Sequence, residues 1–350
     1  MGIEKVNIEN FLALAEQFPV IDVRSPDEYK HAQIPDAYSL PLFSDEERKV
    51  VGTAYKQQSR EVAIKIGLEF FGVKMKKLLE EAEGIIAGNK TTEKGNTVLL
   101  YCWRGGMRSA GVAWLLDMYG FKVYTLVCGY KSFRNWVLKQ FEKEYALKIL
   151  GGYTGSGKTP LLKELEKNNN AVVDLEGLAN HKGSAFGAIG EEPQPSQEMF
   201  ENLLAFKLFI QVKNNNEIWL EDESQRIGKM IIPNAFWETM RNSPVYFLDI
   251  PFEERLDYLE KTYGCFEKEM LTDAIVRIQK RLGGLETKNA INFLEESNIK
   301  ECFRLLLNYY DKLYKKGLQN RKNYESLLNI ISCTGVNTSN NIKKLLLQEV

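Results

Sequence analysis

The sequence feature that most constrains this chain is a short glycine-rich loop near its middle. Residues 152–159 read GYTGSGKT, which fits the pattern G-x(4)-G-K-T, and they lie between an apolar run at 147–150 and a helix-forming segment. A strand, this loop and a helix in that order form a P-loop, in which backbone N–H groups and the helix dipole hold a phosphate. The sequence therefore predicts a phosphate site made by Gly152, Gly155, Ser156, Gly157, Lys158 and Thr159.

The P-loop pattern leaves the rest of the phosphorylated ligand open, because it recognises phosphates and not bases. The ligand can be ATP, GTP or another phosphorylated substrate, and Thr159 would bind Mg²⁺ if the ligand brings it. Arg277 and Arg281 stand four residues apart on a predicted helix, so both charges lie on one face, toward a phosphate or toward solvent. Carboxylates at the ends of two predicted strands are either solvated or candidates to position a metal ion or a water molecule: Asp174, Glu221, Asp222 and Glu223.

A second loop of chemical interest begins at Cys102. The sequence CWRGGMRS follows the strand-like run TVLLY (97–101) and precedes an apolar helix that ends at Gly120. A neighbouring arginine and a helix amino terminus both favour the thiolate form of a cysteine, and loop N–H groups can hold an oxyanion. We therefore predict that Cys102 is a nucleophile assisted by Arg104 and Arg108. Without this context a lone cysteine would be interpreted as a buried packing residue.

The remaining cysteines indicate neither a disulfide framework nor a zinc site. The chain has five cysteines, an odd number, and they are widely spaced with no C-x-x-C pair. We interpret Cys128, at the end of a predicted strand, as structural, although it can lie near the Cys102 loop. Cys265, Cys302 and Cys333 are interpreted as packing residues of a helical tail.

The length of 350 residues predicts two α/β domains, because one ordinary core rarely grows so large. The first domain is expected at 1–145, with a charged helical insertion near 44–94 that ends in the turn-rich GNKTTEKGN (88–96). A short helix follows its first strand. The strands of this domain are predicted at 19–23, 97–101 and 121–127.

The second domain is expected at 146–350 and repeats a strand–helix rhythm, which implies a mostly parallel sheet. A helix is predicted at 196–213. From residue 252 onward the pattern is helical, with 329–333 as the one candidate for a further strand, and this tail is expected to pack over the sheet. The strands are predicted at 147–150, 171–175, 217–222 and 244–250.

Composition narrows the cellular setting and the partners. No apolar run reaches the roughly 20 residues that a membrane span needs, and the acidic, amphipathic amino terminus is unlike a signal peptide. We therefore expect a cytoplasmic protein with no membrane contact. Lys and Arg number 46 against 47 Asp and Glu, so a nucleic-acid partner would have to be held by a local basic patch.

The first domain resembles the rhodanese family. The stretch IDVRSPDEYKHAQIPDAYSLPL matches the opening motif of that family at Asp22, Arg24, Glu28, His31, Ile34 and Pro35, and YCWRGGMRS matches its active-site loop. The resemblance implies sulfur or selenium transfer through Cys102. Five residues separate Cys102 from Arg108, one more than ordinary sulfurtransferases of this fold have. That longer loop also fits the C-x(5)-R-[ST] pattern of cysteine phosphatases, and Tyr101 stands where those enzymes carry histidine.

A rhodanese domain followed by a P-loop domain resembles the tRNA 2-selenouridine synthase family over essentially the whole chain. Further stretches support the resemblance, and the third of them contains His181 and Lys182, which are candidate phosphate partners. The chain departs from the family pattern at Lys182, where arginine is expected, and at Cys128, where glycine is expected. The supporting stretches are LPLFSDEERKVVGTAYKQ (40–57), GYKSFR (129–134), DLEGLANHKGSAFG (174–187) and EDESQRIG (221–228).

The family resemblance implies a two-stage exchange at the wobble uridine of tRNA, with no bound cofactor. Geranyl diphosphate first alkylates the sulfur of 2-thiouridine, and selenophosphate then replaces the S-geranyl group with selenium. Our hypothesis puts selenophosphate at Cys102, Arg104 and Arg108, and the diphosphate, with Mg²⁺ as a candidate companion, at Gly155, Lys158 and Thr159. The alternative hypothesis puts selenophosphate on the P-loop and makes Cys102 a covalent relay.

The partners implied are tRNA and an enzyme that supplies selenophosphate. The basic, aromatic segment 309–324 is a candidate tRNA contact, because tyrosine can stack on bases and lysine can pair with phosphates; it can equally be an ordinary amphipathic helix. Three other functions stay open. They are a P-loop ATPase or kinase with a rhodanese sulfurtransferase domain, a cysteine phosphatase of rhodanese fold, and a non-catalytic phosphate- or RNA-binding module.

Overall fold

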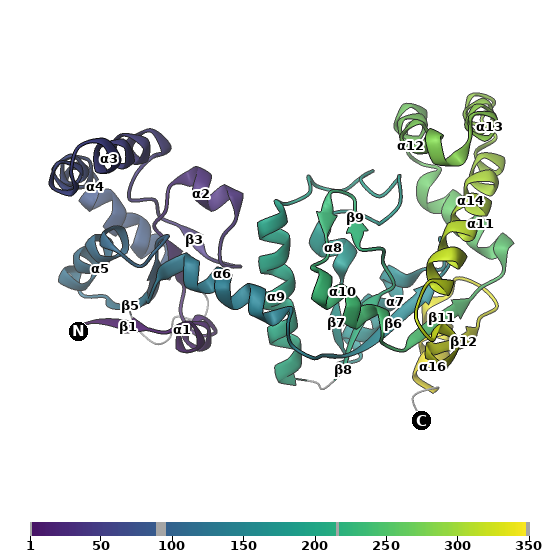
Figure 1. Ribbon diagram of the computed structural model, residues 1–350, viewed down its shortest axis with the longest axis horizontal. Coiled ribbons are helices and arrows are strands. Elements are labelled where there is room, and N and C mark those ends of the chain that lie inside the picture. The colour runs from purple at the N-terminus through teal and green to yellow at the C-terminus, as the bar shows by residue number, and fades with distance from the viewer. Residues whose placement is uncertain (1, 89–95, 215–216, 348–350) are drawn as a thin grey trace. The chain divides into compact units, whose positions relative to one another are not determined.

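The computed structural model describes residues 2–88, 96–214 and 217–347, which form two compact units (Figure 1). The units divide between Lys139 and Gln140, a few residues before the boundary expected from the sequence. Each unit contains a five-stranded sheet whose neighbouring strands all run parallel. The predicted α/β class is therefore confirmed. No helix among the described residues is long and apolar enough to cross a membrane.

The sheet of the first unit has the order β1-β5-β4-β2-β3, so that β4 lies in the middle. Every residue of β4 is buried, which explains its uninterrupted TVLLY sequence, because a central parallel strand is covered on both faces. The edge strand β1 was not predicted; its mostly exposed residues give it no apolar pattern. The strands are β1 (Ile3–Val6), β2 (Val20–Asp22), β3 (Tyr38–Ser39), β4 (Thr97–Tyr101) and β5 (Lys122–Leu126).

The helical insertion of the first unit consists of α3 and α4. Helix α3 begins with a capping box in which Ser44 and Glu47 exchange side-chain and backbone hydrogen bonds. Phe71 and Leu78 of α4 join the apolar core of the sheet. Residues 89–95 of the expected turn-rich end lie outside the described residues. The helices are α1 (Ile8–Ala15), α2 (Pro26–His31), α3 (Asp45–Gln57), α4 (Arg60–Gly88), α5 (Met107–Tyr119) and α6 (Gly129–Gln140).

The sheet of the second unit has the order β12-β11-β6-β8-β7, and its middle strand β6 leads into the P-loop. The candidate strand at 329–333 is confirmed as the edge strand β12. A short antiparallel pair, β9 and β10, was not predicted. The strands are β6 (Ala146–Gly152), β7 (Ala171–Val173), β8 (Glu217–Glu221), β9 (Arg226–Ile227), β10 (Met230–Ile231), β11 (Val245–Asp249) and β12 (Leu328–Ser332).

Helices α7 and α16 cover the sheet of the second unit. Leu161 and Leu165 of α7 share one apolar core with Ile342 and Leu345 of α16 and with Trp219 of β8. Helix α9 contacts β7 and β8, and α10 contacts β6. These helices are α7 (Lys158–Lys167), α8 (Leu175–Ala179), α9 (Gln197–Asn214), α10 (Asn234–Arg241), α15 (Tyr324–Leu327) and α16 (Thr338–Leu347).

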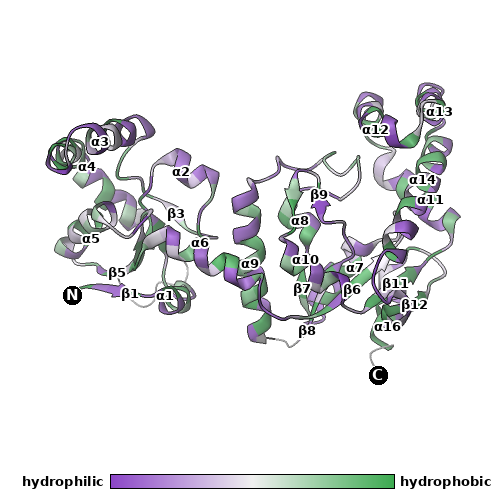
Figure 2. Ribbon diagram, in the orientation of Figure 1, coloured by the Kyte–Doolittle hydropathy of each residue, from purple (hydrophilic) through white to green (hydrophobic). Residues whose placement is uncertain are grey.

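Helix α16 of the tail covers the sheet as expected, whereas four other helices of the tail form an apolar core of their own. Leu256, Leu271, Ile275 and Leu306 belong to this core, which contains no residue of a strand. Each helix carries hydrophobic and hydrophilic residues (Figure 2), and the hydrophobic side is used between the helices. They are α11 (Phe252–Tyr263), α12 (Lys268–Leu282), α13 (Gly284–Glu295) and α14 (Ile299–Gln319).

Candidate functional site

The predicted P-loop forms the turn from β6 into α7. Gly155 and Gly157 have φ angles of 81° and 73°, a region that residues with a side chain rarely adopt. A Cβ at Gly155 would also lie 2.9 Å from the carbonyl oxygen of Arg255. The hydroxyl of Ser156 is buried and has no hydrogen-bond partner among the described residues. This unpaired donor fits a loop that is built to bind an anion.

Lys158 and Thr159, the last two residues of the P-loop motif, begin helix α7 and lie close to the glycines of the loop. The Lys158 ammonium donates a hydrogen bond to the carbonyl oxygen of Gly152 at 3.1 Å, and the Thr159 hydroxyl donates to Oε2 of Glu176 at 3.2 Å. Glu176 was not predicted as a site residue, although it lies in the DLEGL stretch. The Lys158 ammonium and the Thr159 hydroxyl therefore both lie beside the glycines of the loop.

Three glutamates, Glu176, Glu221 and Glu223, lie close together next to the P-loop. The backbone N–H of Glu176 donates to Oε1 of Glu221 at 2.6 Å, while Oε2 of Glu221 has no partner among the described residues. Burial raises the pKa of Glu176, Glu221 and Glu223 above the ordinary value of a glutamate, and the negative charge of the neighbouring carboxylates adds to the shift. These carboxyls consequently retain protons at a pH where an exposed glutamate has lost its own.

Asp222 lines the cavity beside the P-loop, and its side chain is bonded to two side chains of the second unit. Its carboxylate accepts a hydrogen bond from the Tyr314 hydroxyl at 2.7 Å and pairs with the guanidinium of Arg321. The same Tyr314 oxygen accepts a hydrogen bond from the backbone N–H of Gly152 at 3.1 Å. Tyr314 of α14 therefore ties the first glycine of the P-loop to the end of β8.

Arg255 of α11 holds the P-loop from the other side. Its guanidinium donates to the carbonyl oxygens of Thr154 and Ile250, both at 3.1 Å. It also forms a two-point ion pair with Asp311 of α14, at 2.9 and 2.7 Å. Arg255 is only 3% exposed. Its hydrogen bonds and ion pair are therefore a buried support of the loop and not a surface contact.

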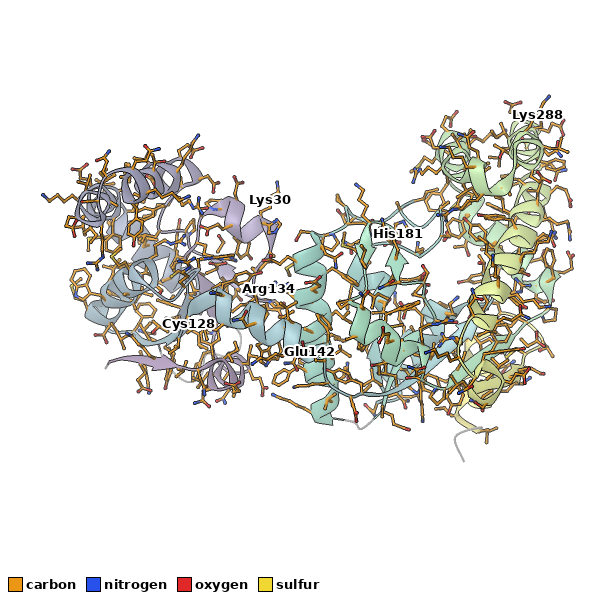
Figure 3. The ribbon with its side chains drawn as sticks, viewed as in Figure 1. Lys30, Cys128, Arg134, Glu142, His181 and Lys288 are labelled. Atoms are coloured by element: carbon orange, nitrogen blue, oxygen red, sulfur yellow. The ribbon has the colours of Figure 1, made fainter. Side chains whose placement is uncertain are left out.

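A cavity of about 1130 Å³ opens on the P-loop and brings together most of the predicted residues of this domain. His181, labelled in Figure 3, lies in the loop after α8, and Arg277 lies on α12. Burial and the charge of Arg277 lower the pKa of His181. The predicted residues that line the cavity are Gly155, Ser156, Gly157, Lys158, Thr159, His181, Lys182, Asp222, Glu223, Arg277 and Arg281.

Three predicted residues support the site without lining the cavity. Gly152 gives its N–H to Tyr314, and Glu221 lies beneath Glu176. Asp174 caps the amino terminus of α8 by accepting a hydrogen bond from the N–H of Gly177 at 2.7 Å.

The cysteine loop occupies the equivalent place in the first unit, at the end of its middle strand β4. Cys102 is 3% exposed, and its sulfur lies 3.3 Å from the hydroxyl oxygen of Ser109 at the start of α5. The carbonyl oxygen of Cys102 accepts a hydrogen bond from the N–H of Tyr130 at 2.8 Å. Gly105 and Gly129, with φ angles of 62° and 56°, let the two backbone segments touch. The loop is thus rigidly held against the start of α6.

The two arginines of the cysteine loop have different surroundings. Arg104 is exposed, whereas the guanidinium of Arg108 pairs with Oε2 of Glu28 at 2.7 Å. Burial alone would raise the pKa of Glu28, but the hydrogen bond and charge of Arg108 lower it below its ordinary value. Arg108 is therefore oriented by a carboxylate that any incoming anion must share or displace.

The opening motif of the first domain builds a support beneath the cysteine loop. Asp22 and Arg24 form a fully buried ion pair, and the Arg24 guanidinium lies 3.9 Å from the ring centre of Tyr130. Arg24 also donates to the carbonyl oxygen of Ala32 at 2.7 Å. The aromatic ring of Tyr130 in turn stacks on Tyr101. Asp22 and Arg24 thus support the cysteine loop through Tyr130, whose N–H is bonded to the carbonyl oxygen of Cys102.

The other cysteines divide by burial. Cys302 and Cys333 are buried as expected, and burial raises the pKa of Cys302 to about 12. Cys265 is exposed, so its interpretation as a packing residue is wrong; it follows the end of α11, outside the apolar core. Cys128 is also exposed, and its backbone lies against Gly105, so it is next to the Cys102 loop, as its position after the strand allowed; its φ of 59° explains why glycine is expected at this position.

Two family models match this chain. The tRNA 2-selenouridine synthase AAA domain matches residues 145–329, and the rhodanese-like domain matches residues 8–135. A tRNA 2-selenouridine synthase from Sulfurovum sp. (strain NBC37-1) is 35% identical over 331 residues, which cover 85% of this chain and 87% of that relative. The chain belongs to the tRNA 2-selenouridine synthase family.

Two further members of the family give the same result. The tRNA 2-selenouridine synthase of Shewanella denitrificans is 34% identical over 87% of this chain and 89% of its own length. That of Nitrosomonas europaea is 38% identical over 79% of this chain and 70% of its own length. The matches of the family models include both the Cys102 loop and the P-loop. The two loops that the sequence analysis identified are therefore both part of the regions that match this family.

Sequence reasoning missed three residues of the P-loop site: Glu176, Arg255 and Tyr314. Glu176 lies within a stretch that resembles the family, so that resemblance was a usable signal. Arg255 and Tyr314 lie on helices far along the chain; Tyr314 belongs to segment 309–324, whose sequence indicated a tRNA contact and not a contact with the P-loop.

Proposed function

We propose that this protein converts 2-thiouridine at the wobble position of tRNA to 2-selenouridine, through an S-geranyl intermediate. The observation that carries the proposal is the match of most of the chain, including both loops, to tRNA 2-selenouridine synthases. The reaction needs two phosphorylated donors, and the protein offers a P-loop and a cysteine loop flanked by arginines.

The first stage alkylates the tRNA sulfur. The sulfur of 2-thiouridine attacks C1 of geranyl diphosphate, the C–O bond of that carbon breaks, and diphosphate leaves. Lys158 and the N–H groups of residues 155–159 would bind the diphosphate and stabilise the charge that grows on it. Thr159 and Glu176 fit a Mg²⁺ ion that arrives with the diphosphate, because their oxygens lie side by side at the phosphate end of the cavity.

The second stage replaces sulfur by selenium. The selenium atom of selenophosphate attacks C2 of the base, the C–S bond breaks, and geranylthiol leaves. Water then cleaves the P–Se bond and releases phosphate, which leaves the selenocarbonyl. In the proposed assignment Cys102 acts at this stage, and Arg104 and Arg108 neutralise the phosphate oxygens of selenophosphate.

An alternative assignment keeps the same reaction and exchanges the sites. Selenophosphate would bind the P-loop, while the Cys102 thiolate would expel geranylthiol from C2 and would itself be expelled by selenium. A Lys158→Ala variant that still alkylates tRNA but no longer selenates it would favour this assignment. Loss of alkylation in the same variant would favour the first.

The tRNA contact and the supply of selenophosphate complete the proposal. Segment 309–324 is less suited to stacking than its sequence indicates, because the hydroxyls of Tyr310 and Tyr314 are bonded to Ala185, Gly152 and Asp222 inside the domain. Its exposed lysines, Lys312, Lys315 and Lys316, are available to pair with tRNA phosphates. An enzyme that makes selenophosphate would act before this protein.

The decisive experiment supplies the two donors separately and together. The protein is incubated with 2-thiouridine-containing tRNA, and the digested nucleosides are analysed by mass spectrometry, with Cys102→Ser in parallel. We expect S-geranyl-2-thiouridine with geranyl diphosphate alone and 2-selenouridine with both donors, the second product being lost in Cys102→Ser. An unchanged nucleoside in every reaction, with folded protein and bound tRNA, would refute the proposal.

A further inference from the structure

A series of aromatic rings leads from the interior of the first unit to the surface beside Cys102. Tyr101 and Tyr130 are fully buried, and their ring centres lie 6.1 Å apart in a stacked arrangement. The ring centre of Trp103 lies 5.6 Å from that of Tyr130, with the two planes tilted by 35°. Trp103 is 38% exposed, so it is the outermost ring of the series and has surface left for a further contact.

The backbone holds Trp103 in place next to the predicted nucleophile. The carbonyl oxygen of Trp103 accepts a hydrogen bond from the N–H of Lys131 at 3.1 Å, and the carbonyl oxygen of Cys102 accepts one from the N–H of Tyr130 at 2.8 Å. The Arg24 guanidinium, 3.9 Å from the ring centre of Tyr130, adds a cation–π contact to the buried part of the series. A tryptophan held in this way loses little conformational freedom when a ligand packs on it.

Two exposed cations adjoin Trp103. Arg104 is the next residue of the loop, and Lys131 is the residue whose N–H binds the Trp103 carbonyl oxygen. Neither side chain forms an ion pair within residues 2–88, 96–214 and 217–347, whereas Arg108 is paired with Glu28. An aromatic ring beside two such charges fits a partner that combines planar rings with negative charge, and an unpaired nucleotide combines both.

The position of the Cys102 thiol requires a base that has left its stack. Cys102 is 3% exposed, so a base of an anticodon loop has to leave its neighbours before its C2 atom can approach the sulfur. Enzymes that act on a base take it out of the stack, and the base then loses the contact with its neighbours. Trp103, adjacent to Cys102 in the chain, offers an aromatic surface that replaces this contact.

We propose that Trp103 stacks on the wobble base of the bound tRNA and that Lys131 pairs with a phosphate of the same strand. The inference rests on the proposed function, and it deepens that function by placing the base-binding surface of the selenium stage in the cysteine loop. Trp103 and Lys131 then bind the RNA, while Arg104 and Arg108 hold the selenium donor.

The first experiment measures whether Trp103 and the wobble base interact directly. Two anticodon stem–loops, one with 2-thiouridine at the wobble position and one with an abasic nucleotide there, are titrated with the full-length wild type and with Trp103→Ala by fluorescence anisotropy. We expect Trp103→Ala to weaken binding of the first RNA by about tenfold and to leave binding of the abasic RNA unchanged, because its stacking partner is already missing. Equal losses for both RNAs would overturn the proposal.

Two further variants separate stacking from charge. Trp114→Ala is the matched control, because Trp114 is another exposed tryptophan of the first unit, on α5, and its removal should change either affinity by less than about twofold. Lys131→Ala should weaken binding of both RNAs by the same factor and lower the log–log salt slope by about one, since one phosphate contact is lost.

Conservative variants keep the test valid if Trp103→Ala disturbs the loop. Trp103→Phe retains an aromatic ring and Trp103→Leu retains only an apolar side chain, so the phenylalanine variant should bind the 2-thiouridine RNA more tightly. Equal affinities of these two variants, with thermal unfolding like that of the wild type, would show that Trp103 contributes packing and not stacking.

Turnover distinguishes this inference from the proposed function. Formation of 2-selenouridine is measured over a range of tRNA concentrations, and Trp103→Ala should lower kcat/KM by about tenfold with a raised KM for tRNA. Wild-type kinetics in Trp103→Ala would overturn the stacking site and leave the proposed function standing. If the wild type itself binds neither stem–loop and converts no tRNA, the proposed function fails and this inference fails with it.

Discussion

The hydroxyl of Tyr314 donates a hydrogen bond to the carboxylate of Asp222 at 2.7 Å and accepts one from the N–H of Gly152 at 3.1 Å. A single phenol oxygen therefore connects helix α14, the end of β8 and the first glycine of the P-loop. Burial, followed by the charge of Asp222, raises the pKa of Tyr314 well above its ordinary value, so the phenol stays protonated and continues to donate.

Removal of this hydroxyl should destabilise the second unit. In Tyr314→Phe the N–H of Gly152 loses its partner, whereas Asp222 keeps Arg321, so we expect the free energy of unfolding to fall by about 1–3 kcal/mol in urea titrations. Tyr309→Phe on the same helix is the control, because the Tyr309 hydroxyl makes no hydrogen bond to the described residues. Equal stability of the two variants would show that the Tyr314 bridge contributes nothing.

Replacement of Arg255 by lysine should destabilise the second unit. A lysine keeps the charge but cannot reach Thr154, Ile250 and Asp311 together, because it lacks the planar guanidinium. We expect Arg255→Lys to lower the free energy of unfolding by about 1–3 kcal/mol, since a buried carbonyl loses its donor, and to weaken diphosphate binding. Arg304→Lys, in a more exposed ion-pair network of α14, should leave the free energy of unfolding nearly unchanged, because solvent screens that network.

The parts of the site that could be predicted are those built from neighbouring residues. The P-loop and the Cys102 loop each follow one strand and precede one helix, so a few residues suffice to identify them. The contacts that hold the P-loop are not local: Tyr314 reaches Gly152 across 162 positions and Arg255 reaches Thr154 across 101. Only the fold brings such residues together, and the sequence around neither of them indicates contact with the P-loop.

The same reasoning explains the errors in the fold. Strand β1 pairs with β5 at the edge of the sheet. Its exposed Glu4 and Lys5 interrupt the apolar pattern by which a strand is recognised in a sequence. Helices α11 to α14 have the amphipathic pattern expected of a layer on a sheet, but that pattern does not say which surface covers the apolar side. In this protein the apolar sides of these four helices cover one another.

The glutamate cluster should make stability fall as pH rises. Glu221 has a folded-state pKa raised by burial and by the charges of Asp174 and Glu176, so the folded protein binds more protons than the unfolded chain above pH 4.5, the ordinary value. Its stabilising contribution is complete below that pH and is lost as pH rises through the folded-state pKa. Glu221→Gln keeps an acceptor for the N–H of Glu176 and should raise the free energy of unfolding at pH 8 by about 1–3 kcal/mol. Urea titrations from pH 5 to 8 check this, and a pH slope that the variant leaves unchanged would contradict it.

The pair of Arg108 with Glu28 provides a test of which loop handles selenium. If Arg108 holds selenophosphate, Arg108→Ala should reduce formation of 2-selenouridine by roughly a hundredfold, because one preorganised cationic donor is lost, and should leave S-geranylation unchanged. Arg48→Ala is the matched control: Arg48 also faces Glu28, at 3.6 Å, but it is 53% exposed, so its removal should change either rate by less than about twofold. The two rates are measured on the same tRNA by quantifying both nucleosides. A loss of geranylation in Arg108→Ala, with selenation of pre-geranylated tRNA intact, would move selenophosphate to the P-loop and leave the cysteine loop to the alkylation stage.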